Sequence, residues 1–181
     1  MSPSKVLGIA FFNRSTPVVA RELLGKRLCR QVDKRDTFHL RICETEAYDG
    51  PEDKACHAHH GKTSRNEVMF GPPGYWYVYL CYGMHWMLNA VTGPIDYPAA
   101  VLIRGCCGIS GPGRLTKNFS IGKVQDRREI ARASGLWVED DGFLVQDEEI
   151  ETGPRIGIGY AGSEWENKPY RFVWKQMPCE I

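Results

Sequence analysis

The sequence predicts an α+β fold: a single domain with a curved, largely antiparallel β-sheet, flanking helices and a protruding β-hairpin. Two observations support this class. Two pairs of runs rich in β-branched and aromatic residues are each joined by a short turn, which indicates hairpins. Much of the remaining chain alternates between strand-forming runs and turns, with few helical segments. Its 181 residues suit one domain, residues 1–181.

The first expected element is a helix over residues 16–24. Thr16 suits the N-cap, Pro17 suits the first helical position, and Gly25 follows the end of the apolar run. This helix has a structural role, because it carries no cluster of reactive side chains.

Strands follow from runs of β-prone residues bounded by turn residues. The predicted strands are residues 26–31, 37–47, 75–81, 84–91, 99–104, 136–139, 143–146, 155–160 and 170–174. Residues 33–36 form the turn of the first hairpin, and further helical segments are expected at residues 64–69, 111–117 and 126–134. Gly111 to Lys117 would present backbone N–H groups and two cations, an arrangement that binds phosphate readily.

The strand over residues 37–47 ends in an unusual way. Side chains alternate along a strand, so Glu44, Glu46 and Tyr48 share one face. Two carboxylates conflict with β-propensity, and such conflicts concentrate at functional sites. This strand end is therefore the leading candidate for an active site.

The turn Tyr82-Gly83 joins the two strands of the second hairpin, and a large ring at such a tip cannot be buried by its own hairpin. Tyr82 is either a surface residue packed on a neighbouring loop or a wedge between stacked bases. On the first strand of this hairpin, Tyr75, Tyr77 and Tyr79 share a face that either belongs to the core or lines a pocket for a flat ligand.

A long loop over residues 49–74 contains Cys56-His-Ala-His-His60. Long structured loops are usually functional. No second Cys/His cluster accompanies these residues, and two ligands from one loop do not complete a zinc site. We therefore expect no metal and no cofactor.

Composition is that of an ordinary globular protein, with 43% hydrophobic and 25% charged residues and a net charge of +1. The charge is unevenly distributed: residues 104–132 carry seven Lys and Arg against two acids, and residues 139–151 carry seven acids and no base. A basic segment of this kind indicates contact with a polyanion, although a solvated face is an equal alternative. The seven cysteines occur without a secretory signal, which predicts reduced thiols. The sequence also contains no apolar run of membrane-spanning length, so we expect no membrane partner and a cytoplasmic location, or a nuclear one in a eukaryote.

Several motifs in one order closely resemble the alkyladenine (3-methyladenine) DNA glycosylase family. They are R-I-x-E-T-E-A-Y-x-G-P-E-D-x-A-x-H, R-N-x-x-M-F, P-G-x-x-Y-V-Y-x-x-Y-G-M-x-x-x-x-N, V-L-I-R, G-P-G-R-L and R-I-G-I-G-x-A-G-x-E-W. The resemblance implies a fold similar to a formyltransferase C-terminal domain and a monomer that acts on double-stranded DNA containing damaged purines. The chain departs from the family in the short connection over residues 105–110 and in residues 92–98.

The resemblance also implies roles for individual residues. Glu46 would be the general base that activates water, and Arg104 would help to hold that water. Tyr48, His57 and Tyr79 would sandwich the flipped base, while Asn89 would exclude the exocyclic amine of guanine. Tyr82 would intercalate into the DNA, and Arg114 would contact a phosphate.

The implied reaction is excision of 3-methyladenine, 7-methylguanine, hypoxanthine or ethenoadenine in base excision repair, leaving an abasic site. The motifs place no lysine in the base pocket, so a monofunctional enzyme without lyase activity is expected. Two alternatives are a non-catalytic nucleic-acid-binding module of the same fold and a small-molecule glycoside hydrolase that uses Glu44 and Glu46.

Overall fold

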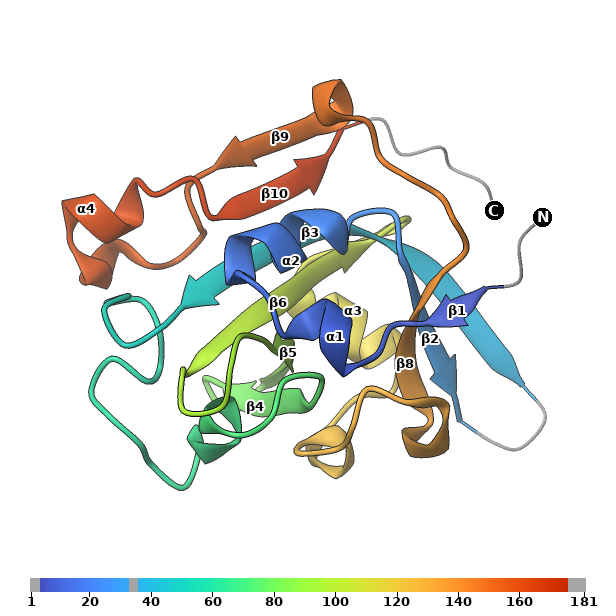
Figure 1. The fold of residues 1–181 in the computed structure, drawn as a ribbon, viewed down its shortest axis with the longest axis horizontal. Coiled ribbons are helices and arrows are strands. Elements are labelled where there is room, and N and C mark those ends of the chain that lie inside the picture. The colour runs from blue at the N-terminus through green and yellow to red at the C-terminus, as the bar shows by residue number, and fades with distance from the viewer. Residues whose placement is uncertain (1–3, 33–35, 176–181) are drawn as a thin grey trace.

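The computed structural model describes residues 4–32 and 36–175, and within them a ten-stranded antiparallel sheet curls into a half-barrel (Figure 1). The strands are β1 (Lys5–Val6), β2 (Arg27–Gln31), β3 (Thr37–Asp49), β4 (Trp76–Cys81), β5 (His85–Val91), β6 (Ala99–Cys106), β7 (Ile109–Ser110), β8 (Leu136–Asp140), β9 (Ile150–Gly153) and β10 (Arg171–Trp174). Their main order is β1-β8-β2-β3-β6-β5-β4, with β10 beside β3 and β9, and β7 beside β6. The predicted α+β class is confirmed.

Short helices cover this sheet. They are α1 (Ile9–Phe12), α2 (Thr16–Glu22), α3 (Pro112–Asn118) and α4 (Ser163–Glu166), with 3₁₀ turns at η1 (Glu67–Phe70), η2 (Lys123–Gln125), η3 (Arg132–Ser134), η4 (Asp147–Glu149) and η5 (Gly159–Ala161). In Figure 1, α1 and α2 lie in front of the sheet and α3 lies behind it. No helix among the described residues has the length and apolar character needed to cross a membrane.

Strand β3 is the central element, because it pairs along both of its edges. Residues 37–41 pair with β2 and residues 42–49 lie beside β6, while residues 44–46 also pair with β10. The main hydrophobic core, which includes Phe12, Leu28, Ile42 and Trp76, packs around it. The strand is therefore held rigidly where its last residues reach the candidate site.

The predicted hairpins are both present, β2 with β3 and β4 with β5. The expected turn at residues 33–36 falls mostly outside the described residues. Helix α2 begins at Thr16, but Ser15 is its N-cap residue and the Thr16 hydroxyl instead accepts a hydrogen bond from Thr92 at 3.1 Å. The N-cap prediction was therefore wrong by one residue.

The helix predicted over residues 126–134 is wrong, because this segment bonds to the edge of the sheet instead. Arg127 donates its backbone N–H to Trp76, and Trp76 donates to Arg128, each at 2.8 Å. The Asp126 carboxylate accepts from the N–H of Val78 at 2.9 Å. These bonds satisfy backbone groups at the edge of β4, which would otherwise be an exposed strand edge and an aggregation hazard. The tertiary contact therefore decides the conformation of this segment against its local helix propensity.

The strands predicted at residues 143–146 and 155–160 are also wrong. Residues 143–146 have no regular structure. The side chains of Phe143 and Val145 instead pack so closely against Gly25 that a Cβ atom there would lie 2.9 Å from each of them. The N–H of Ile156 donates to a carboxylate rather than to a neighbouring strand. Strand β9 was missed at residues 150–153, because it is only four residues long and two of them, Glu151 and Gly153, have little strand propensity.

Candidate active site

The end of β3 carries two carboxylates and a tyrosine on the sheet face opposite helix α2. On the helix side, the Thr45 hydroxyl donates to the carbonyl of Ala20 at 2.7 Å. Because side chains alternate along a strand, Glu44, Glu46 and Tyr48 point away from the helix, as the sequence predicted. Pairing with β6 fixes the directions of all three side chains, and β10 also pairs with Glu44 and Glu46.

Glu46 is fully buried, with 0% of its surface exposed. Its Oε1 accepts from the backbone N–H of Ile156 at 2.8 Å, and its Oε2 accepts from the Tyr48 hydroxyl at 2.9 Å. Burial raises the pKa of this carboxyl, while the Arg104 charge, the Ile156 amide and the Tyr48 hydroxyl each act in the opposite direction. A carboxylate with a raised pKa beside a pocket has the properties of a general base.

Arg104 reaches both carboxylates because the register between β3 and β6 shifts beside it. Glu44 lies opposite Gly105, one position out of step with the pairs that follow, so Arg104 is an extra residue in β6. Such a bulge redirects a side chain. From this position Arg104 donates from Nε to Glu44 at 3.0 Å and from Nη1 to Glu46 at 3.4 Å.

Glu44 lies between two arginines. Its Oε1 accepts from Nε of Arg104 at 3.0 Å and from Nε of Arg171 at 2.6 Å. These ion pairs make Glu44 an anchor for the residue beside the candidate base. They also argue against a glycoside hydrolase in which Glu44 acts as the second catalytic carboxylate.

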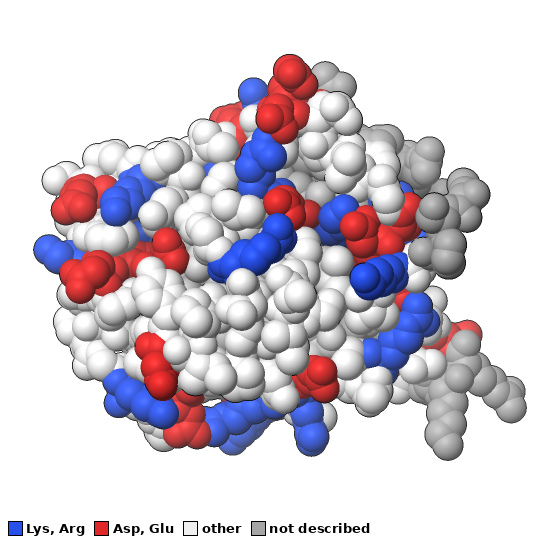
Figure 2. Space-filling view, viewed as in Figure 1, with Lys and Arg blue, Asp and Glu red and all other residues white. Residues whose placement is uncertain are grey.

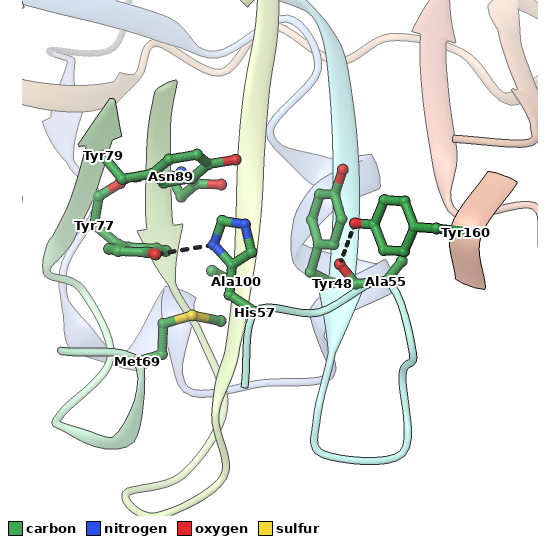
Figure 3. Close-up of a pocket in the computed structure, with 9 residues that line it drawn as sticks. All are labelled: Tyr48, Ala55, His57, Met69, Tyr77, Tyr79, Asn89, Ala100 and Tyr160. Carbon is green, nitrogen blue, oxygen red and sulfur yellow. Dashed lines mark hydrogen bonds between the residues drawn. The ribbon is translucent and has the colours of Figure 1, made fainter. Parts of the chain in front are cut away.

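A pocket opens beside this carboxylate and holds about 350 Å³ of space, its mouth included. Its lining residues are Tyr48, Ala55, His57, Met69, Tyr77, Tyr79, Asn89, Ala100 and Tyr160. Figure 3 shows His57, Tyr77 and Tyr79 on one side, and Tyr48 with Tyr160 on the other. The structure therefore brings together all four residues predicted to bind the base, Tyr48, His57, Tyr79 and Asn89.

The wall opposite Tyr48 is held by contacts among its own rings. The rings of His57 and Tyr79 lie 4.6 Å apart, and a hydrogen bond of 2.9 Å joins His57 Nδ1 to the Tyr77 hydroxyl. The Asn89 side chain donates to the carbonyl of Tyr77 at 3.1 Å. Arg65 lies over the Tyr79 ring at 4.8 Å.

His57 is a neutral ring near pH 7. Desolvation among the pocket side chains and the nearby charge of Arg65 lower the pKa of its imidazole to about 4. An uncharged imidazole does not repel a cationic ligand, whereas a protonated one would. The pocket can therefore accept a flat cation between His57 and Tyr48.

Tyr82 projects from the tip of the β4–β5 hairpin with 88% of its surface exposed. The loop holds Tyr82, Gly83 and Met84, one residue more than predicted, since the last strand pair is Cys81 with His85. Tyr82 has a φ of 49° and Gly83 a φ of 69°. A bulky residue in this left-handed region is strained by roughly 1–3 kcal/mol, and such strain concentrates at functional sites.

Arg114 lies in α3 and is exposed. Within residues 4–32 and 36–175, its side chain makes no hydrogen bond or ion pair, and the same holds for Lys117 in the same helix. The structure therefore leaves these cations available to a partner. It does not place Arg114 in the pocket.

The acidic segment has a structural role. Asp140 pairs with Lys26 at 2.8 Å, Asp141 pairs with Arg41 at 2.8 Å, and Asp147 pairs with Arg21. Figure 2 shows acidic and basic side chains next to one another at several places on one face of the molecule. The uneven charge of the sequence thus becomes a set of paired acids alongside unpaired bases in α3.

Two histidines of the segment Cys56-His-Ala-His-His60 have separate hydrogen-bond partners. No group of three or more His, Cys, Asp or Glu side chains that could hold a metal occurs in the part of the chain that the structure describes. His57 bonds to Tyr77, and His59 bonds to the carbonyl of Pro51 at 2.8 Å. The two rings therefore point to different partners.

Sequence reasoning missed several residues around the pocket. Tyr160 lines its mouth and donates to the carbonyl of Ala55 at 3.3 Å, as Figure 3 shows. Residues 155–156 hold the back of the site through a buried guanidinium and the amide on Glu46. The R-I-G-I-G motif was the available signal, but reading it as a strand hid its role.

The shortened connection between β6 and α3 is a tight hairpin. Strand β7 pairs with the end of β6, so that Gly105 lies opposite Ser110 and Cys106 opposite Ile109. This connection leads directly to Gly111, the N-cap residue of α3. The short loop thus brings α3 close to the strand that carries Arg104.

Comparison with known proteins identifies the class to which this fold and site belong. The family model described as methylpurine-DNA glycosylase matches residues 10–109 and 108–178. Relatives from Methanocella arvoryzae, Psychrobacter cryohalolentis and Anaeromyxobacter dehalogenans, each named "Putative 3-methyladenine DNA glycosylase", are 44%, 40% and 44% identical to the chain. The alignments cover 96%, 97% and 93% of this chain and 94%, 94% and 82% of the relatives.

The chain belongs to the methylpurine-DNA glycosylase family. It is accordingly a DNA-repair hydrolase that acts on N-glycosyl bonds. The family resemblance inferred from the motifs is confirmed over most of the chain.

Proposed function

We propose that this glycosylase flips damaged purines of the 3-methyladenine, 7-methylguanine, hypoxanthine and ethenoadenine class out of duplex DNA and hydrolyses their glycosidic bonds. One observation carries the proposal. Tyr48 is at once a wall of the flat aromatic pocket and a hydrogen-bond donor to Glu46 at 2.9 Å. A base stacked on Tyr48 therefore lies beside the candidate general base.

The hairpin tip supports base flipping. Removing a base from the stack costs a few kcal/mol, and least for a damaged or mispaired base. The exposed ring of Tyr82 can occupy the space that the base leaves and so offsets part of this cost. The unpaired cations of α3 supply charge for the DNA backbone.

Stacking in the pocket favours alkylated purines. Methylation at N3 or N7 gives the purine a positive charge, and an aromatic face attracts a cation by roughly 0.5–2 kcal/mol. Tyr48 and Tyr79 provide such faces, and neutral His57 adds no opposing charge. Asn89 at the pocket wall excludes an exocyclic amine by shape, as the family resemblance implies.

The reaction breaks the bond between C1′ of deoxyribose and the purine nitrogen, and the purine leaves with the electron pair. A cationic alkylpurine leaves as a neutral base, which makes its departure easy. Positive charge develops on the sugar, where the Glu46 carboxylate stabilises it. Water then adds to C1′, and Glu46 takes its proton, while Arg104 holds the carboxylate in place.

Glu46 retains acceptor capacity for this water. Each carboxylate oxygen has two lone pairs. Oε2 accepts from both Tyr48 and Arg104, but among the described residues Oε1 accepts only from Ile156, so one lone pair of Oε1 remains for water. Closure of the pocket by a bound base also excludes bulk water, which strengthens the electrostatic contacts of the carboxylate.

A panel of duplexes, each with one damaged purine, tests the proposal. Wild type should release the bases, while Glu46→Gln should be slower by about 10²- to 10⁴-fold, the usual contribution of a general base. Glu148→Gln, at an exposed position in η4, is the matched control and should resemble wild type. Equal release by wild type and Glu46→Gln would refute the assignment of the base.

A further inference from the structure

A buried ion pair lies directly behind the pocket. Arg155 and Asp53 both have 0% side-chain exposure, and two hydrogen bonds of 2.5 and 2.8 Å join their side chains. Neither residue lines the pocket, and the reaction described above uses neither of them. Such a fully buried charged pair needs an explanation, because its net contribution to stability is small or unfavourable.

The guanidinium of Arg155 contacts strand β3 at two points. Nη1 donates to the carbonyl of Ala47 at 2.8 Å, and the guanidinium carbon lies 4.8 Å from the centre of the Tyr48 ring. The ring of Tyr48 therefore has its pocket on one side and Arg155 near it on the protein side. The next residue, Ile156, donates its N–H to Glu46 at 2.8 Å.

Asp53 extends the same network into the loop that carries the opposite wall. Its Oδ2 accepts from the N–H of Asp49 and its Oδ1 from the N–H of Ala55, both at 3.0 Å. Two residues further along lies His57, which contributes to the other side of the pocket. One ion pair thus connects the end of β3, the loop over residues 49–57 and the segment that begins at Arg155.

We propose that Arg155 and Asp53 are positioning residues, which together set the width of the base slot and hold the Ile156 amide on the catalytic carboxylate. This inference rests on the proposed function, because it assigns the pair a task in that site. The geometry favours positioning over simple stabilisation. Each side chain fixes backbone groups that belong to pocket walls, and Nε of Arg155 is buried without a hydrogen-bond partner within residues 4–32 and 36–175.

An arginine is required here because its planar fork can bond to a carboxylate with two nitrogens and stack on an aromatic ring at the same time. A lysine retains the charge and can pair with Asp53, but it cannot make both contacts. Arg155→Lys therefore removes the positioning geometry and leaves an ion pair in place. Asp53→Asn weakens the two-nitrogen pair by changing its carboxylate instead of its guanidinium, and it keeps one side-chain oxygen as an acceptor for a backbone N–H.

The test measures single-turnover release of hypoxanthine and 3-methyladenine, with thermal unfolding of each variant in parallel. Arg155→Lys should lower the rate per folded molecule by about 10- to 100-fold, since small misplacements at a reacting centre have effects of this size. Asp53→Asn should show a smaller loss of the same kind. If Arg155→Lys fails to fold, the rate of folded Asp53→Asn decides the question.

The matched control is Arg41→Lys. Arg41 lies in β3, seven residues before Tyr48, and also forms a two-nitrogen pair, with Asp141. This variant should lose comparable thermal stability and retain wild-type rates. Loss of activity in Arg41→Lys equal to that in Arg155→Lys would overturn the inference, because both losses would then follow from stability alone.

The pH profile gives a readout that stability does not move. The hydrogen bond from the Ile156 amide favours the ionised form of Glu46. If Arg155→Lys displaces this amide from Glu46, the pKa of Glu46 rises and the acid limb of the rate profile should shift to higher pH. Arg104, Glu44, Tyr48 and Arg171 also face Glu46 and keep their identities in this variant, and lysine keeps the positive charge that Arg155 places near Glu46. An unmoved acid limb with a wild-type rate would refute the positioning role.

Failure of the inference and failure of the proposed function are distinguishable in the same experiment. If wild type shows no Glu46-dependent base release, the proposed function itself is wrong. If wild type is active and Arg155→Lys equals it, only the positioning role is wrong.

Discussion

The hydrogen bond from Tyr48 to Glu46 gives a prediction in which one atom separates two roles. Tyr48→Phe retains the ring that stacks on the base and removes the hydroxyl that donates to Oε2 of Glu46 at 2.9 Å. This hydroxyl favours the ionised carboxylate, so its loss should raise the pKa of Glu46 further above its ordinary value. The active, deprotonated form would then appear only at higher pH.

The size of the shift follows from the strength of the bond. A hydrogen bond to a charged group contributes about 1.5–3 kcal/mol, and about 1.4 kcal/mol corresponds to one pKa unit. The acid limb of the rate profile should therefore move up by about one to two pH units. Above the new limb the rate should approach that of wild type, because the ring and the carboxylate are both still present.

The assay is single-turnover release of hypoxanthine from a duplex at a series of pH values, fitted for the acid limb and the plateau. Tyr79→Phe is the matched control, since it also removes a pocket hydroxyl but one that makes no hydrogen bond to Glu46. A Tyr48→Phe profile with an unmoved acid limb would show that the hydroxyl does not tune the base. A lowered plateau with an unmoved limb would instead assign the hydroxyl to substrate contact.

Three further predictions address the hairpin tip, the acid pairs and the chemistry. Tyr82→Ala should lower the rate of base release from duplex DNA by about tenfold and lower the rate for the same lesion in single-stranded DNA far less. Tyr82→Phe keeps the ring and should resemble wild type. Equal losses on both substrates would exclude the role of Tyr82 as a wedge. The Arg41 guanidinium lowers the pKa of Asp141 to about 2. This pair therefore stabilises the fold fully at pH values above the ordinary pKa of an aspartate, and its contribution is lost as the pH falls through about 2. Asp141→Asn should therefore reduce the free energy of unfolding by about 1–2 kcal/mol at pH 7 and by progressively less in acid, as urea titrations can measure; a difference independent of pH would contradict this. Finally, no lysine of residues 4–32 and 36–175 lines the base pocket, so hypoxanthine duplexes should show strand breaks only after alkali or heat, and borohydride should trap no covalent complex. Trapping that disappears in Lys54→Gln would instead assign lyase chemistry to the neighbouring hollow, which Lys54 lines.

The fold was predictable wherever local signals agreed with tertiary demands. Helix α2, the two hairpins and strand β6 were found close to their positions, because their residue patterns match their burial. The α-helix predicted over residues 126–134 was not found, since residues 127–130 bond to β4 and to the chain just before it, and only a 3₁₀ turn follows among these residues. Local propensity carries no information about an unpaired strand edge elsewhere in the chain.

The candidate site shows the same division. Alternation along β3 was enough to place Glu46 and Tyr48 on one face, and hairpin geometry was enough to place Tyr82 at a tip. Motif resemblance added His57, Tyr79 and Asn89, all of which line the pocket. Tyr160 and the Arg155–Asp53 pair were not found, because their contacts join residues about 100 positions apart.

By itself, the sequence determined the class of fold, the family and the side chains that could take part in the reaction, because these depend on residue type and short-range spacing. The tertiary structure decided how those side chains are held. It buried Glu46 beneath the pocket wall, placed Arg104 on a bulge between two carboxylates, and anchored Tyr48 from behind with a charge pair. The physical reason is that desolvation and long-range hydrogen bonds set the pKa and position of a reactive group, and both arise only when distant segments pack together.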